Sequence, residues 1–65
     1  MYKNLIIEFK KNNIKIKDIA LILNISPLSL RKKIKGEKKF DIAECLKLQK
    51  NIGDGNICLE YLFKS

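Results

Sequence analysis

The sequence predicts an all-α protein that forms one compact domain of five short helices. Apolar residues recur at helical spacing along the chain, whereas no segment alternates apolar and polar residues as a half-buried strand would. Signals for helix starts and helix ends divide the chain into short pieces, with no low-complexity linker between them. The 65 residues suffice for one small core but not for two, so residues 1–65 are expected to be a single domain.

The first two predicted helices each carry one apolar stripe. In the first helix, the i, i+3, i+4, i+7 spacing is met by Tyr2, Leu5, Ile6 and Phe9. This helix is expected to end near Asn12 and Asn13. In the second helix, the stripe consists of Ile16, Ile19, Ala20 and Leu23. Asn24 then ends the pattern, because asparagine tolerates the left-handed backbone conformation that turns a chain sharply.

The third predicted helix has both a start signal and an end signal. Ser26 is a good N-cap, Pro27 fits the first helical position, and Gly36 suits the left-handed position that closes a helix. At about 100° per residue, Leu30 and Ile34 face the other helices. The opposite face gathers three cations and one apolar residue, namely Leu28, Arg31, Lys32 and Lys35.

The last two predicted helices follow Phe40. Asp41 is an N-cap that can form a capping box with Glu44, and Phe40 and Cys45 are placed to form a hydrophobic staple around it. We assign the inner face of this fourth helix, which lasts until Gly53, to Ile42, Cys45, Leu46 and Ile52. A short fifth helix is expected from about Asn56 to Phe63.

Positive charge is concentrated in one part of the chain. Residues 1–39 carry eleven Lys/Arg against three Asp/Glu, a net charge of +8, whereas residues 40–65 have a net charge of −1. Six of the fourteen cations lie within residues 31–39. This distribution favours a surface that meets a polyanion, and the alternative is a solvated helix face that keeps a small protein soluble.

The composition argues against an enzyme, a cofactor and a metal site. The chain has no histidine, and its two cysteines lack a C-x-x-C spacing, so ligands for zinc and a histidine general base are both missing. We expect Cys45 to be a reduced, buried thiol, with a disulfide to Cys58 as the alternative. No apolar run approaches the ~18 residues of a membrane span, and the first residues do not read as a signal peptide, so a cytoplasmic location is expected.

A motif in residues 14–36, IKIKDIALILNISPLSLRKKIKG, is set by eight positions in order: Ile19, Ala20, Leu23, Ile25, Ser26, Leu30, Ile34 and Gly36. In this order they resemble the helix-turn-helix of the phage Cro and repressor family, with the motif at about residues 15–36. The resemblance implies a compact, five-helix, lambda-repressor-like domain. It also implies a phage or prophage transcriptional regulator, such as a repressor, that binds an operator in double-stranded DNA as a homodimer.

Three positions depart from the family pattern. Asn24 stands where the family usually has glycine, which is tolerable for the conformational reason given above. Lys15 and Ile16 replace the usual cap and the glutamine that approaches the DNA backbone, so the second helix is expected to have a poorer cap. Pro27 and Leu28 replace polar residues that often read bases, although Leu28 can still touch a thymine methyl group.

The third helix supplies most of the expected contacts to DNA. Base contacts are predicted for Pro27, Leu28, Arg31 and Lys32, and phosphate contacts for Lys17, Ser26, Lys35, Lys38 and Lys39. A dimer interface is predicted at Tyr61, Leu62 and Phe63. The bland alternatives are solvated charge for the cations, helix capping for Ser26 and simple core packing for the three C-terminal residues. No small-molecule substrate and no membrane are expected as partners.

Two other functions stay open on the sequence alone. One is a protein-interaction module that kept the helix-turn-helix fold and lost DNA binding, which Pro27 and Leu28 make conceivable. The other is a basic peptide that lies on a membrane surface, which net charge and helicity would allow. Against the second stands the distribution of the apolar residues over several helices that need one another.

Overall fold

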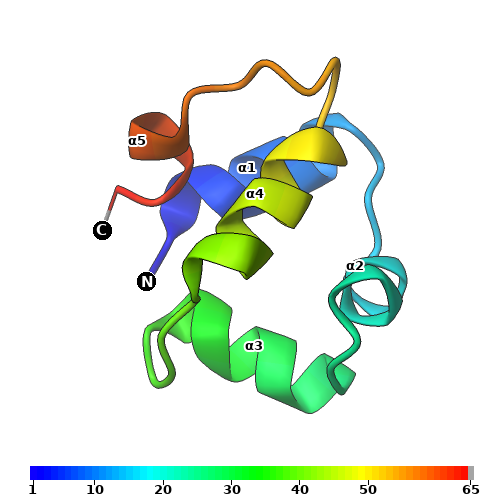
Figure 1. Ribbon diagram of the computed structural model, residues 1–65, viewed down its shortest axis with the longest axis vertical. Helices are drawn as coiled ribbons and strands as arrows, with labels where there is room; N and C mark the ends of the chain where they lie inside the picture. The colour runs from blue at the N-terminus through cyan, green and yellow to red at the C-terminus, as the bar shows by residue number, and fades with distance from the viewer. Residues whose placement is uncertain (65) are drawn as a thin grey trace.

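Five helices make up the regular secondary structure of residues 1–64, which the computed structural model describes (Figure 1). Their bounds are α1 Lys3–Lys11, α2 Ile16–Leu23, α3 Pro27–Lys35, α4 Ile42–Lys50 and α5 Leu59–Leu62. No strand occurs in this part of the chain. The prediction of a compact, all-α domain with five helices is therefore confirmed, and the domain measures 25 × 22 × 21 Å.

Local signals in the sequence set the turn before α3 and both of its ends. Asn24 adopts the left-handed conformation, with φ 59° and ψ 43°, and so does Gly36, with φ 90°. The Ser26 hydroxyl oxygen accepts a hydrogen bond from the backbone N–H of Ser29 at 3.1 Å, and Pro27 occupies the first helical position. By contrast, Lys15 caps α2 without any side-chain hydrogen bond, as its residue type predicts.

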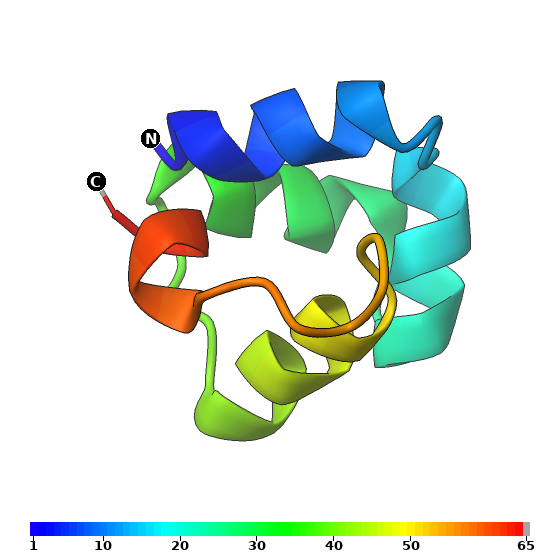
Figure 2. The same ribbon diagram turned by 90° about the horizontal axis from the view of Figure 1, so that it is seen from above.

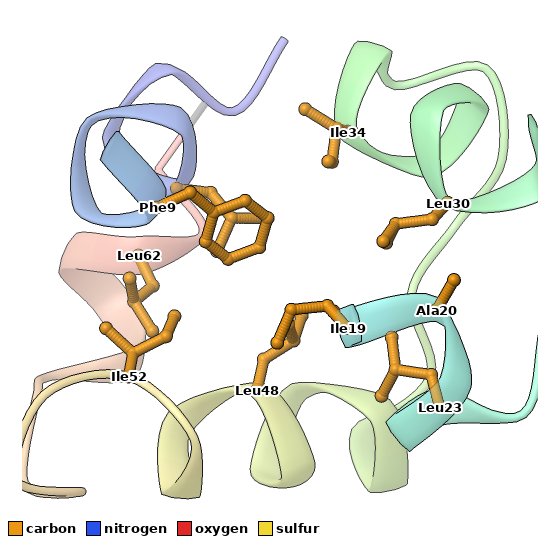
Figure 3. Close-up of a cluster of buried hydrophobic side chains, with 10 residues drawn as sticks. Phe9, Ile19, Ala20, Leu23, Leu30, Ile34, Leu48, Ile52 and Leu62 are labelled. Atoms are coloured by element: carbon orange, nitrogen blue, oxygen red, sulfur yellow. The ribbon is translucent and has the colours of Figure 1, made fainter. Parts of the chain in front are cut away.

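The hydrophobic core draws on every helix (Figure 3). Its buried members are Leu5, Phe9, Ile19, Ala20, Leu23, Leu30, Ile34, Leu48, Ile52 and Leu62. Seven of the ten residues predicted for the apolar stripes of the first three helices are among them, while Tyr2, Ile6 and Ile16 pack on the core half-buried. Because each helix is short, no single one can bury enough apolar surface alone, and burial in a shared core is what holds them folded.

The predicted inner face of α4 is wrong for two residues. Ile42 is 79% exposed and Leu46 is 43% exposed, whereas Leu48 is fully buried. The capping box itself forms as predicted, since Asp41 accepts from the Glu44 N–H and Glu44 accepts from the Asp41 N–H. The helix is rotated so that Glu44 faces inward, and apolar spacing could not reveal this because it counts a glutamate as a solvent-facing residue.

The fifth helix is shorter than predicted and begins at Leu59 rather than near Asn56. The Asn56 N–H donates to the Asp54 carboxylate at 3.0 Å, and the carbonyl of Ile57 accepts from the Gln49 side chain at 2.7 Å. These bonds hold the backbone before Cys58 in an irregular path. A helix can therefore start only after Cys58, which is its N-cap.

The main contacts between helices involve three pairs. The second helix packs against both α3 and α4, and α1 packs against α5. The start of α1 meets the end of α3, where the Tyr2 N–H donates to the Ile34 carbonyl at 3.0 Å, so the two helices run in opposite directions (Figure 2). Three aromatic rings, those of Tyr2, Phe40 and Phe63, stack edge to face or tilted with centroids 5.2–5.7 Å apart.

Among residues 1–64, no helix has both the length and the apolar character that crossing a lipid bilayer demands. The longest helices of the described chain have nine residues, about half of what a bilayer core requires. Each of these helices contributes to the common core, for example with Phe9, Ile34 and Leu48 (Figure 3).

Candidate nucleic-acid interface

The third helix presents a basic face to solvent. Leu30 and Ile34 are buried, whereas Leu28 is 63% exposed and Arg31 and Lys35 are exposed beside it. Lys32, on the same side, is half-buried. No acidic residue occurs in Pro27–Lys35, so nothing within the helix offsets these charges. The predicted separation of an inner apolar edge from an outer cationic face is confirmed.

The hydroxyl group of Ser26 serves the start of α3. It accepts from the Ser29 N–H and donates to the Ser29 hydroxyl oxygen, both at 3.1 Å. The capping role thus accounts for this side chain. The first turn of α3 contains no acidic residue, so the positive end of the helix dipole stays uncompensated at this site. An anion approaching this end would be stabilised by the dipole.

A turn of three residues, 24–26, brings the start of α3 close behind α2. It is held by the Ile25 N–H, which donates to the Ala20 carbonyl at 2.9 Å. Arg31 and Lys35 flank a hollow of about 200 Å³ with apolar walls, to which Ile16 at the start of α2 also contributes. Lys17 follows Ile16 and is exposed, so the structure brings the first turn of α2 beside the outer cations of α3.

Lys33 differs from the other five cations of residues 31–39 because it points inward. Its ammonium group lies 2.6 and 2.5 Å from the two carboxylate oxygens of Glu44, and the two side chains are only 14% and 11% exposed. The same group lies 5.9 Å from the centre of the Phe40 ring. The sequence analysis did not predict this pair, although two signals were present. Lys33 is adjacent to the buried Ile34, and the capping box placed Glu44 in the first turn of α4.

The loop after α3 carries two more exposed cations, Lys38 and Lys39. It leaves the helix through Gly36, and the Glu37 N–H then donates to the Lys32 carbonyl at 2.9 Å. Lys38 and Lys39 therefore follow the end of α3 that is opposite to Ser26. The exposed cations thus run from Arg31 in the middle of α3 to the loop beyond its last turn.

The three predicted interface residues near the C-terminus lie in different environments. Leu62 is fully buried within one chain, so its assignment to a dimer interface is corrected to the core. Phe63 is half-buried in the aromatic cluster. Tyr61 is 38% exposed, but its hydroxyl donates to the Glu8 carboxylate at 3.0 Å, and this hydrogen bond raises the pKa of Tyr61. Of these three residues, Tyr61 and the outer part of Phe63 are accessible to a second copy.

Both cysteines are free thiols, with Cys45 half-buried and Cys58 exposed. Burial raises the pKa of the Cys45 thiol, and the nearby carboxylates of Asp41 and Glu44 raise it further. Within the described chain, no group of three or more His, Cys, Asp or Glu side chains is placed so that it could hold a metal ion.

The structure thus gathers most of the predicted contact residues around α3. Pro27, Leu28 and Arg31 are exposed along the helix, and the predicted phosphate-binding residues Lys17, Ser26, Lys35, Lys38 and Lys39 are exposed around it. Comparison with protein-family models, with curated proteins and with solved structures found no match to this chain. The candidate interface therefore rests on the geometry described above.

Proposed function

We propose that this protein is a transcriptional regulator that binds double-stranded DNA through α3, in a lambda-repressor-like helix-turn-helix arrangement with α2. The observation that carries the proposal is the exposed face of α3, which combines three cations with one apolar side chain and contains no acidic residue. A helix fits the major groove, which is about 12 Å wide, and phosphates line the groove on both sides. The short turn before α3 leaves its first residues free to enter the groove.

In this proposal the residues that read sequence lie on the exposed face. Arg31 and Lys32 donate hydrogen bonds to base edges, with guanine as the natural acceptor of either side chain. Leu28 contacts a thymine methyl group, and Pro27 lies against the same groove. The 63% exposure of Leu28 supports this role, because an apolar side chain so exposed gains by leaving water.

The residues around α3 hold the sugar-phosphate backbone. Lys35, Lys38 and Lys39 neutralise phosphates at one end of the helix, and Lys17 does so from the start of α2. Ser26 contributes through the uncompensated helix dipole at the start of α3, since its hydroxyl is used in the cap. Such contacts fix the register of the protein on DNA but carry no sequence information.

A homodimer would allow two copies of α3 to read two half-sites. Successive major grooves on one side of DNA are about 34 Å apart, more than the 25 Å length of one chain. Tyr61 and the outer part of Phe63 are retained as the proposed contact, with Leu62 supporting them from the core. We propose a cytoplasmic repressor of a phage or prophage with no cofactor.

The decisive experiment is an in vitro selection of the purified protein against random duplex DNA. Recovery of two copies of a short motif, related by two-fold symmetry and about one helical turn apart, is the expected result. A single motif would keep DNA recognition and remove the dimer. A pool without any enriched sequence would contradict sequence-specific regulation.

A protein-interaction module is the second candidate, and it is favoured by the exposed aliphatic side chains on the outer surface. Leu21 and Leu28 are both mostly exposed, and Pro27 replaces a base-reading side chain. Alanine at Arg31 and Lys32 would leave partner binding unchanged in such a module, whereas it would remove selective DNA binding in the regulator. The third option, a membrane-surface peptide, is disfavoured because the apolar stripes of α1, α2 and α3 are packed in the common core.

A further inference from the structure

The contacts of Glu44 tie together two parts of the molecule. Its side chain accepts the Asp41 N–H at 3.0 Å, which completes the capping box of α4, and both of its oxygens accept from Lys33 on α3. Glu44 is 8% exposed, although glutamate is almost never buried unless it is paired. The Glu44 side chain therefore caps the start of α4 and is hydrogen-bonded to Lys33 in the last turn of α3 at the same time.

Direct packing between α3 and α4 is slight, which gives this ion pair its importance. The extensive helix contacts are those of α2 with α3, α2 with α4, and α1 with α5. The end of α3 is also held by the buried Ile34 side chain and by the Tyr2 N–H, which donates to the Ile34 carbonyl. Within residues 1–64, Lys33–Glu44 is the only ion pair with nitrogen and oxygen within 4.0 Å, and it lies on the side of α3 opposite to the exposed cations.

We propose that Lys33 and Glu44 are positioning residues that set the rotation and tilt of α3, and thereby which bases Arg31 and Lys32 can reach. The inference rests on the proposed DNA-binding function. Lys33 itself touches no DNA in this arrangement, because its ammonium group is held by Glu44 and lies against the Phe40 ring. A buried ion pair often adds little net stability, since desolvation offsets the attraction, yet its geometry restricts how two elements can sit.

The test compares a neutral pair with the native pair. Lys33→Met removes the charge and keeps most of the length of the side chain, and Glu44→Gln keeps an oxygen that can accept the Asp41 N–H. The double variant leaves no buried charge unpaired, so it is expected to fold with a thermal midpoint above that of either single variant. Lys33→Arg retains a donor to Glu44 and serves as the rescue variant. Lys38→Met is the matched control, because it removes one exposed cation from the same basic surface.

Affinity is measured for two duplexes, the one that the unmodified protein selects and one of equal composition with its motif scrambled. The double variant is expected to lose about tenfold in the ratio of the two affinities, which corresponds to one misplaced base contact. Lys33→Arg keeps the native ratio, and Lys38→Met weakens binding to both duplexes while leaving the ratio unchanged. A folded double variant with the native ratio would overturn the proposal.

A second measurement tests whether the Lys33–Glu44 pair sets the orientation of α3, independently of the proposed DNA-binding function. Backbone residual dipolar couplings report the orientation of α3 relative to α4 without any DNA. If the unmodified protein selects no duplex, the regulatory function fails, but the couplings still decide whether the pair sets the helix orientation. A changed orientation in the double variant supports this role of the Lys33–Glu44 pair, and identical couplings refute it.

Discussion

Lys33 and Lys35 are two residues apart on α3 and differ in what they contact. Lys33 is paired inside the molecule, whereas Lys35 is exposed on the outer face. Net charge counts both residues equally, but only a cation that reaches a phosphate releases a counterion from DNA. The charge of a residue thus predicts its role less well than the direction of its side chain.

This difference gives a prediction about salt dependence. Lys35→Met is expected to reduce the log–log slope of DNA affinity against salt concentration by about 2 for the proposed dimer, because one phosphate contact in each of the two chains disappears. Lys33→Met should leave the slope unchanged. Fluorescence anisotropy at several salt concentrations measures both, with Lys47→Met on the exposed part of α4 as the charge-matched control. Equal effects of Lys35→Met and Lys47→Met would contradict a specific role for α3.

Cys45 and Cys58 are expected to react with iodoacetamide at different rates. Cys45 is half-buried and its pKa is raised, first by burial and then by Asp41 and Glu44, so little of it is thiolate near neutral pH. We expect alkylation of Cys45 to be about tenfold slower than that of the exposed Cys58, as measured by mass spectrometry of the peptides. Raising the pH should accelerate Cys45, because its thiolate fraction grows until the pH passes its folded pKa.

The same shift has a consequence for stability. A folded pKa above the unfolded value means that the folded state holds the proton more tightly. The stability that Cys45 contributes is therefore present below its unfolded pKa and is lost as the pH rises through its folded pKa. Alkylation of Cys45 at the same rate as Cys58 would show that the thiol is not shielded.

At the scale of elements, the turn between α2 and α3 depends on the backbone conformation of one residue. Asn24 has φ 59°, where most L-residues are strained, and the Ile25 N–H closes the turn on Ala20. Asparagine tolerates this conformation better than other residues that have a side chain. The turn therefore forms with a residue other than glycine at this position.

Substitution at Asn24 should distinguish conformational strain from other roles. Asn24→Ala is expected to lower the free energy of unfolding by about 1 kcal/mol, because alanine resists the left-handed conformation. Asn24→Gly should change it by less than about 0.5 kcal/mol or raise it slightly, since glycine adopts that conformation freely. Urea denaturation followed by circular dichroism measures both, and a larger loss with glycine than with alanine would argue against strain.

At the scale of the whole molecule, charge and assembly decide how the protein would bind DNA. A dimer that neutralises six to ten phosphates is expected to give a salt slope of about −5 to −9. Analytical ultracentrifugation with the selected duplex should show two chains per duplex. A flat salt response would contradict the proposed mode of binding, and one chain per duplex would leave recognition intact while removing the dimer.

The predicted features that the structure confirms share a local origin. The caps of α3 and α4, the left-handed Asn24 and Gly36, and the apolar stripes of the first three helices each depend on residues within about two turns of one another. The errors concern residues whose surroundings depend on contacts outside their own helix. Ile42 and Leu46 proved exposed, and α5 proved short because Gln49 holds the carbonyl of Ile57.

For the candidate interface, the sequence by itself determined which face of α3 is apolar and which is cationic, because helical spacing and the caps at Ser26 and Gly36 set the helix and its faces. Only the tertiary structure decided that Lys33 pairs with Glu44, that Leu62 belongs to the core and that the start of α1 closes on the end of α3. These contacts join residues far apart in the chain. Their existence depends on how five short helices share one core, which no local pattern of residues specifies.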